Sequence, residues 1–205
     1  MKKKIIITGG LGYIGTELCK LYSGVSWHHK ILVIDNRFIS ERVNQIRNWN
    51  MEFIQGDILD KNLIYQNFKD ADVVHHLAGI TDVPRTKNDS STIQDDKIKE
   101  VGEKGTQNIL DVINEKCKII FPSTHVVYEG LDKIKTDIDE NERTRPVLSY
   151  SSSKAKNEDQ IKKSGKNYII LRLGSVYGYS TDSMRIDIMP NLFSKITSQD
   201  GTLKL

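Results

Sequence analysis

The chain has 205 residues, of which 38% are hydrophobic and 28% are charged, and its formal net charge is +3. This length suits one sizeable domain, alone or with a fragment of a second, and the composition is that of a globular protein. The small charge and scattered basic residues argue against a nucleic-acid partner, and no apolar run approaches the ~18 residues that span a membrane.

Short apolar runs of strand length alternate along the chain with longer stretches whose apolar residues recur at helical spacing. Strands are predicted, in chain order, at residues 4–8, 31–35, 52–57, 72–78, 118–123 and 168–173. Helices are predicted at residues 13–22, 61–68, 97–115 and 150–163, and the polar segment 129–146 is predicted to be a surface loop.

The predicted strands are nearly continuous apolar runs, which is typical of a parallel sheet covered on both faces. Strict alternation of strands and helices indicates the same architecture. The sequence therefore predicts an α/β fold, a doubly wound parallel sheet of the Rossmann-like type.

The two cysteines, Cys19 and Cys117, lie far apart in the sequence and do not have the spacing of metal ligands. We expect two reduced thiols and no bound metal. The chain passes directly from its first lysines into a strand-like run, so we expect a cytoplasmic protein without a signal peptide.

Glycines at positions 9, 12 and 15 separate the first predicted strand from the first predicted helix. Glycine allows the backbone to approach a pyrophosphate closely, and a helix N-terminus offers free N–H groups to it. Twenty residues after Gly15, the second strand ends in Asp35, whose carboxylate can accept hydrogen bonds from the ribose hydroxyls of NAD. Arg37 favours a phosphate at the same place, but we expect NAD rather than NADP.

Several segments together resemble one family, the extended short-chain dehydrogenases/reductases of the NAD-dependent nucleotide-sugar epimerase/dehydratase group. The resemblance covers residues 4 to about 205. It is found in TGGLGYIG, VIDN, GDILD, VVHHLAG, KGTQNIL, FPSTHVVYEG, YSSSK and LRLGSVYG.

The resemblance implies a set of cofactor contacts and a set of catalytic residues. The implied contacts with NAD are Gly9, Gly12, Tyr13, Ile14 and Gly15 at the pyrophosphate, Asp35 and Asn36 at the adenosine ribose, Asp57 and Ile58 beside the adenine, and Leu77, Ala78 and Gly79 at the strand end that passes the cofactor. The implied catalytic residues are Thr124, Tyr150 and Lys154, of which Tyr150 and Lys154 also contact the cofactor.

The physical chemistry of these residue types agrees with the implied roles. Tyr150 and Lys154 are four residues apart, so they share one face of a helix. A free tyrosine has a pKa of about 10 and is a poor base at neutral pH, but a nearby ammonium group stabilises its phenolate. Thr124 lies just past a strand end, where its hydroxyl can hydrogen-bond a substrate hydroxyl or carbonyl.

The resemblance implies hydride chemistry at a hydroxyl-bearing carbon of a nucleotide sugar, and an epimerase is the favoured activity. A 4-keto reductase is the alternative, because STHVVYEG also resembles the deoxysugar reductases. A 4,6-dehydratase is disfavoured, because His125 and Val126 occupy the positions of its Asp-Glu pair. An alternative of another class is a non-catalytic NAD-binding sensor or partner-binding domain.

The sequence also departs from the family pattern. Gly102 stands where the family often has an asparagine, and Ser175 replaces the asparagine of the NVYG motif. His76 matches a family position near the cofactor, and we expect it to be a hydrogen-bonded core residue.

We expect an NAD-binding domain at residues 1–178, with 179–205 forming only the beginning of a small C-terminal substrate-binding region. Because the family continues beyond this point, the chain is interpreted as a fragment. The alternatives are a short form completed by another subunit and a short form that binds NAD without turnover. The family also implies a homodimer that pairs through the helices at 97–115 and 150–163.

Overall fold

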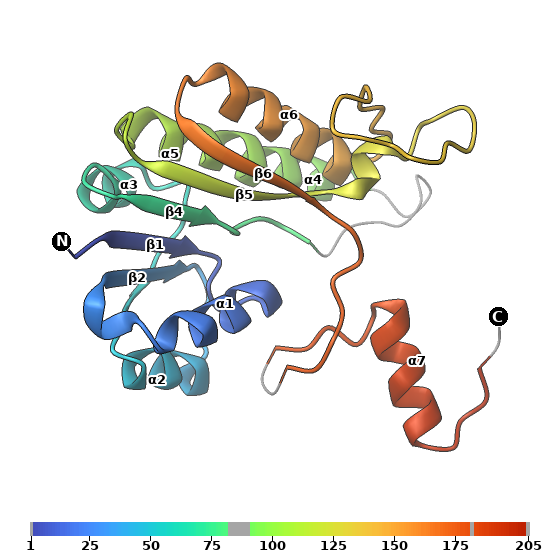
Figure 1. Ribbon diagram of the computed structural model, residues 1–205, viewed down its shortest axis with the longest axis horizontal. Helices are drawn as coiled ribbons and strands as arrows, with labels where there is room; N and C mark the ends of the chain where they lie inside the picture. Colours follow the sequence, from blue (N-terminus) through green and yellow to red (C-terminus); the bar gives the residue numbers. More distant parts are fainter. Residues whose placement is uncertain (1, 82–90, 181–182, 204–205) are drawn as a thin grey trace.

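The computed structural model describes residues 2–81, 91–180 and 183–203. Its centre is a parallel sheet of six strands in the order β3-β2-β1-β4-β5-β6 (Figure 1). The strands are β1 (Lys4–Thr8), β2 (Lys30–Asp35), β3 (Glu52–Gln55), β4 (Val73–His76), β5 (Lys118–Thr124) and β6 (Asn167–Leu173). This arrangement confirms the predicted doubly wound fold.

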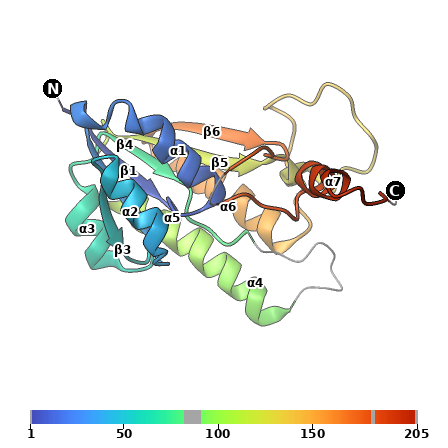
Figure 2. The same cartoon turned by 90° about the horizontal axis from the view of Figure 1, so that it is seen from below.

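Helices lie against both faces of the sheet (Figure 2). One face is covered by α1 (Tyr13–Ser23) and α2 (Ser40–Asn48). The opposite face is covered by α3 (Lys61–Phe68), α5 (Gly105–Val112) and α6 (Ser149–Lys163), and α4 (Thr92–Lys99) packs beside α6. The last helix, α7 (Met189–Ser198), lies apart from the sheet. Within the described ranges, no helix is long and apolar enough to cross a membrane.

The continuous apolar character of β1 follows from this double cover. Ile5 and Ile7 pack toward α1 and α2, whereas Ile6 packs into the cluster formed with α3 and α5. Successive side chains point to opposite faces of a strand, so a strand buried on both faces needs apolar residues at every position.

Two strands end earlier than predicted. The strand expected at 52–57 ends at Gln55, because the Asp57 carboxylate accepts a hydrogen bond from Leu59 N at 2.9 Å and turns the chain. The strand expected at 72–78 is shorter at both ends, and after it Ala78 N donates to the side chain of Thr8 at 3.1 Å instead of to the neighbouring backbone.

The helix predicted at 97–115 is confirmed from 97 to 112, but it is not a single regular helix and its bounds differ. The segment begins earlier, as α4, passes through a π-helical turn at Glu100–Lys104 and continues as α5. Two carbonyl groups of the π-helical turn accept hydrogen bonds from side chains of the neighbouring helix α6. Asn157 Nδ2 donates to Gly102 O and Gln160 Nε2 donates to Glu103 O, each at 3.0 Å. A Cβ on Gly102 would lie 2.3 Å from Ser153 Oγ, so the glycine allows α6 to approach.

Helices α2 and α7 were not predicted. In α2 only Val43 and Ile46 are buried, which is too short a pattern to distinguish from a loop. In α7, Pro190 stands in the first turn, where a proline fixes a helix start. The predicted loop at 129–146 contains only turns and bends and is therefore confirmed.

The close approach at Gly102 predicts a stability change whose sign depends on Ser153. Gly102→Ala should lower the free energy of unfolding by about 1 kcal/mol, because the overlap with Ser153 Oγ outweighs the gain in helix propensity. In a Ser153→Ala background, where the nearest atom is removed, the same change should raise it by up to about 1 kcal/mol. Urea unfolding of the wild type, the two single variants and the double variant measures these free energies. A Gly102→Ala effect of the same sign in both backgrounds contradicts the prediction.

Candidate active site

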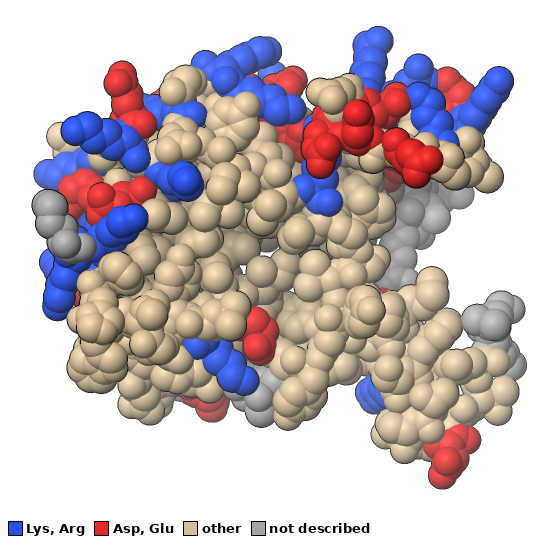
Figure 3. Space-filling view, viewed as in Figure 1, with Lys and Arg blue, Asp and Glu red and all other residues tan. Residues whose placement is uncertain are grey.

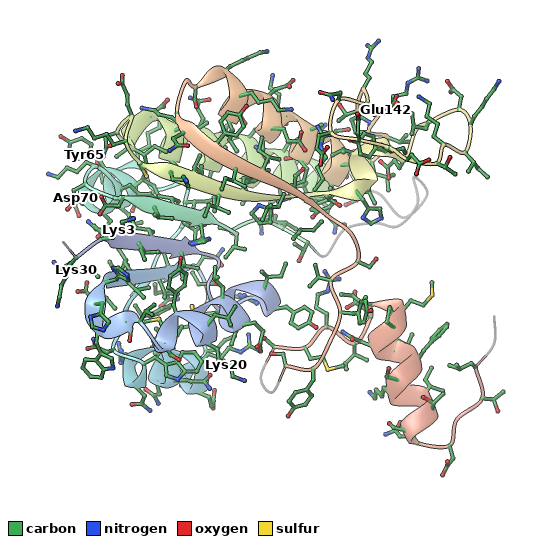
Figure 4. The ribbon with its side chains drawn as sticks, in the orientation of Figure 1. Lys3, Lys20, Lys30, Tyr65, Asp70 and Glu142 are labelled. Carbon is green, nitrogen blue, oxygen red and sulfur yellow. The ribbon has the colours of Figure 1, made fainter. Side chains whose placement is uncertain are left out.

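The candidate site lies at the carboxyl ends of the strands, where the strand order reverses between β1 and β4. Such a reversal leaves a crevice beyond the strand ends, which is where open α/β sheets bind ligands. The glycine turn follows β1, residues 77–79 follow β4, and Thr124 ends β5. Lys3, Lys30 and Asp70 mark the opposite end of the sheet in Figure 4.

The glycine turn has a geometry that side chains would block. Gly9 has a φ of +68°, and a Cβ there would lie 2.8 Å from Ala78 N. A Cβ on Gly15 would lie 2.3 Å from Gly9 O. Gly10, which the predicted motif omitted, is equally constrained, because its Cβ would lie 2.1 Å from Val33 Cγ1. The run of two glycines in TGGLGYIG was the available signal.

Helix α1 begins directly after this turn. Its N-cap residue, Gly12, has a Cβ position 3.2 Å from Gly9 O, and no side chain in the described part of the chain caps it. The first N–H groups of α1 therefore face the crevice side of the turn without a side-chain acceptor, which suits a pyrophosphate. Tyr13 Oη donates to Gly178 O at 2.5 Å, and Ile14 is partly exposed.

Asp35 is buried at the end of β2 and is already paired. Its Oδ2 accepts from Leu11 N at 3.0 Å, and its Oδ1 accepts from Arg37 N at 3.0 Å and Arg37 Nε at 3.1 Å. The Leu11 bond ties the carboxylate to the glycine turn. The Arg37 guanidinium also donates to Oδ2 through Nη2 at 3.4 Å, so both carboxylate oxygens are already hydrogen-bonded. Asn36, beside it, accepts through its carbonyl from Gln55 at 3.2 Å.

The other predicted cofactor residues line the strand ends to either side of β1. Ile58 is buried in the core, so only its backbone is available to an adenine, and its carbonyl accepts from Asn108 at 3.1 Å. Leu77 N donates to Thr8 O at 3.2 Å and keeps the segment after β4 beside β1. Gly79 is exposed. Ile58 follows β3 and residues 77–79 follow β4, and these two strands are separated in the sheet by β2 and β1. Asp57 uses its carboxylate to shape its own turn.

Lys154 on α6 is held under the end of β5. Its ammonium donates to Pro122 O at 2.8 Å and lies 4.4 Å from the centre of the Phe121 ring. The pairing of β4 with β5 extends only as far as Ile120, so Pro122 lies beyond the end of this pairing. Burial lowers the pKa of Lys154 to about 8, although Glu158 raises it in part.

Tyr150 and Thr124 lie on the two elements that meet at Lys154. The Lys154 ammonium is 5.9 Å from the centre of the Tyr150 ring, four residues earlier on α6. Burial raises the pKa of Tyr150, and the positive charge of Arg185 opposes this. Thr124 is buried at the end of β5, and its Oγ1 accepts from Val126 N at 3.3 Å.

A buried ion pair fixes α6 to the strands beneath it. Glu158 accepts from Ser123 Oγ at 2.6 Å and from Arg172 Nη2 of β6 at 2.7 Å. Burial alone would raise the pKa of Glu158, but hydrogen bonds from Arg172 and Ser123 lower it below its usual range. No motif in the sequence marks this pair, because Glu158 and Arg172 lie on a helix and a strand that only the fold brings together.

The histidines have structural contacts. His76 Nδ1 and Nε2 lie 3.0 Å from Thr8 Oγ1 and Thr106 Oγ1, which confirms the predicted hydrogen-bonded core histidine. Burial and the charge of Lys154 lower the pKa of His76 to about 3, so its ring is neutral. His125 is exposed, and its Nδ1 lies 3.2 Å from Leu173 O.

Comparison with known proteins identifies related sequences along nearly the whole chain. The profile of the NAD dependent epimerase/dehydratase family matches residues 5–204. A putative UDP-glucose 4-epimerase from Methanocaldococcus jannaschii is 32% identical over 213 residues, covering 96% of this chain and 66% of the relative. A dTDP-D-glucose 4,6-dehydratase from Dictyostelium discoideum is 32% identical over 197 residues, covering 86% of this chain and 44% of the relative.

Solved structures show the same relationship. The UDP-glucuronic acid 4-epimerase from Bacillus cereus, in complex with UDP-glucuronic acid and NAD, has a TM-score of 0.74 and 26% identity. The match covers 98% of this chain and 64% of that one. The chain thus spans 44% to 66% of the length of these relatives.

The buried ammonium predicts a pH-dependent stability difference. Lys154→Met should raise the free energy of unfolding below pH 8, by on the order of 1–3 kcal/mol, because the buried charge is removed. The pKa of about 8 in the folded chain is below that of an unfolded lysine, about 10.4. The difference in free energy of unfolding between Lys154→Met and the wild type should therefore shrink as the pH rises from about 8 past about 10.4. Urea unfolding across this pH range measures the effect, and a pH-independent difference contradicts it.

Proposed function

Because the chain belongs to the NAD dependent epimerase/dehydratase family, we propose that it is the NAD-binding and catalytic part of a nucleotide-sugar 4-epimerase-type enzyme. The observation that supports this best is the arrangement around Lys154, whose ammonium lies 5.9 Å from the centre of the Tyr150 ring and donates to Pro122 O, two residues before Thr124, at 2.8 Å. A binding module has no need of this arrangement.

The residues at the strand ends fit NAD. The glycine turn leads into the N-terminus of α1, whose N-cap residue Gly12 has no side-chain cap within the described residues, so the free N–H groups of this helix start are available to a phosphate. Asp35 stands at the ribose position. When bound, NAD supplies the acceptor and donor for the hydride that leaves the sugar carbon and returns to it.

Each catalytic side chain has a separate task. Tyr150 takes the proton from the sugar hydroxyl onto its Oη and later returns it. Lys154 supplies the positive charge that favours the phenolate, since it keeps an ammonium at neutral pH with a pKa of about 8. Thr124 orients the same hydroxyl or the carbonyl formed from it. Because hydride returns to the other face of the sugar, the result is epimerisation.

Dehydration is the less favoured reaction. Curated relatives include 4,6-dehydratases, and water elimination needs an additional acid and base. The positions after Thr124 are His125 and Val126, in a short 3-10 turn, and the exposed imidazole lies against Leu173 O. Neither residue supplies the missing carboxylate pair. A 4-keto reductase remains the second candidate, on the resemblance of STHVVYEG.

We propose that the substrate region begins after residue 178. The segment beyond β6 crosses the start of α1, where Ser180 Oγ donates to Glu17 at 2.6 Å. Asn191 in α7 then accepts from Gly178 N at 3.0 Å and donates to Arg185 O at 2.8 Å. These contacts support a division at 178, with residues 179–180 and 183–203 on the crevice side of the sheet.

The cellular location and the oligomeric state of the protein are also proposals. Burial raises the pKa of Cys19 to about 12 and that of Cys117 to about 11, so both thiols suit a reducing, cytoplasmic environment. Homodimer formation through α4, α5 and α6 is supported by the exposed outer layer that these helices form on one side of the sheet.

The pairing of Asp35 with Arg37 predicts a change in cofactor preference. Arg37→Ala should tighten NAD binding by up to about fivefold, because the ribose no longer displaces the guanidinium. Binding of NADP should weaken, because the carboxylate then faces the 2′-phosphate alone. Calorimetry with both nucleotides measures the ratio, with Arg143→Ala in the distant loop as control. An equal change for both nucleotides contradicts the prediction.

The proposed activity predicts a large effect at Tyr150. With NAD and UDP- or dTDP-sugars, Tyr150→Phe should lower kcat roughly 10²–10⁴-fold and leave NAD affinity unchanged. Tyr65→Phe, an exposed tyrosine of α3 labelled in Figure 4, is the matched control.

The products separate the candidate functions. An epimerase interconverts two sugars without net change in NAD, whereas a reductase consumes one NADH for each sugar. Tight NAD binding with no turnover by either protein indicates the sensor, and equal turnover by wild type and Tyr150→Phe refutes the proposed mechanism.

A further inference from the structure

One carboxylate oxygen receives three hydrogen bonds at the start of the helix that contains Tyr150. Glu129 Oε1 accepts from Val147 N and from Leu148 N, each at 2.7 Å. It also accepts from the hydroxyl of Ser151. These donors directly precede α6 or belong to its first turn.

Helix α6 has no capping oxygen of its own at the usual position. Its N-cap residue is Leu148, which has no polar side-chain atom, although Ser151 Oγ accepts from Leu148 N at 3.2 Å. The N–H groups at a helix start need acceptors, and a negative charge there also interacts favourably with the helix dipole. Glu129, 19 residues before Leu148, supplies both from another segment.

The backbone around Glu129 is itself fixed to the base of the long loop. Arg145 N donates to Val127 O and Gly130 N donates to Arg145 O, both at 2.8 Å. A Cβ on Gly130 would lie 2.5 Å from Arg145 O, so this pairing depends on a glycine. The loop at 129–146 is therefore closed at its base, next to α6.

The same segment leads directly back to Thr124. This residue caps the 3-10 turn at His125–Tyr128, and Glu129 is the next residue after that turn. Only one short turn thus separates the hydroxyl of Thr124 from the carboxylate that holds the start of α6. Two of the three proposed catalytic side chains, Thr124 and Tyr150, are joined through Glu129 as well as through the sheet.

We propose that Glu129 is a positioning residue, which fixes the first turn of α6 and thereby sets where the Tyr150 ring lies relative to Thr124. Its action is indirect, through Leu148 and Ser151. Its catalytic consequence rests on the function proposed above, whereas its effect on the helix does not.

Glu142 is a matched control within the same loop. Its Oε2 accepts from Lys135 Nζ at 2.7 Å, and Figure 4 shows it within the loop. Within the described residues it makes no hydrogen bond to the partners of Glu129, which are Val147, Leu148 and Ser151. In Figure 3 the acidic side chains of this region form a mixed patch with lysines and arginines at the surface. Removing the charge of Glu142 therefore leaves the base of the loop intact.

The test compares Glu129→Ala, Glu129→Gln and Glu142→Gln with the wild-type chain. Hydrogen exchange should quicken about tenfold at the amides of Val147 and Leu148 in Glu129→Ala, because the loss of a helix cap frees the first turn. The effect should be smaller in Glu129→Gln, which retains the accepting oxygen, and absent in Glu142→Gln.

A second readout follows Tyr150 itself. With isotopically labelled tyrosine and assignment by Tyr150→Phe, its ring resonance should shift or broaden in Glu129→Ala and not in Glu142→Gln. With a nucleotide sugar, kcat should fall about tenfold while the dissociation constant for NAD stays unchanged, and Glu129→Gln should restore most of kcat.

The outcomes decide the proposal without relying on turnover. Unchanged exchange in Glu129→Ala overturns it, as does faster exchange with an unchanged Tyr150 resonance, which assigns Glu129 a structural role only. Absence of turnover in the wild type counts against the proposed function, and the exchange and resonance results then decide the role of Glu129. If Glu129→Ala does not fold, the same comparison is made with Glu129→Gln.

Discussion

The contact between the segments that follow β1 and β4 determines where everything else in the site can lie. Gly9 passes so close to Ala78 that a single methyl group would overlap its backbone. Thr8 fixes the approach from both sides, since its carbonyl accepts from Leu77 N and its hydroxyl accepts from Ala78 N. Beyond this contact, the connection after β1 leads to one face of the sheet and the connection after β4 leads to the other. The crevice for a dinucleotide opens between these two connections.

The side of the crevice with the proposed catalytic residues is fixed by polar groups that would be costly if unpaired. Lys154 and Glu158 both belong to α6. Lys154 donates to a carbonyl of β5, and Glu158 accepts from Arg172 of β6. An isolated buried charge is strongly destabilising, so each pairing constrains the rotation and position of the helix. The helix cannot shift by a residue without leaving both charges unpaired. The orientation of Tyr150, on the same helix, follows from these constraints.

The sequence was sufficient wherever the physical requirement is local. The glycine turn could be predicted because a positive φ and a close approach are marked by the residue type itself, and Tyr150 and Lys154 because four residues make one helical turn. The π-helical turn could not, since its carbonyls are satisfied by Asn157 and Gln160 from a helix more than 50 residues away. The pairing of Asp35 with Arg37 was not predicted either. The sequence pattern indicated a ribose contact for Asp35 and a phosphate contact for Arg37, and it did not indicate that the two side chains bind each other.

The parallel order of the strands links the cofactor site to the folding of the whole sheet. Thr8 and His76, which meet beneath the crevice, are 68 residues apart in the chain, and none of the neighbouring strands is joined by a hairpin. Long-range pairing of this kind forms late and as a unit, because the cost of closing large loops precedes any gain. A partly folded chain therefore has the glycine motif but not the crevice. Dinucleotide affinity is thus a measure of global folding, and a ligand that binds only the completed sheet shifts the unfolding equilibrium of the entire domain.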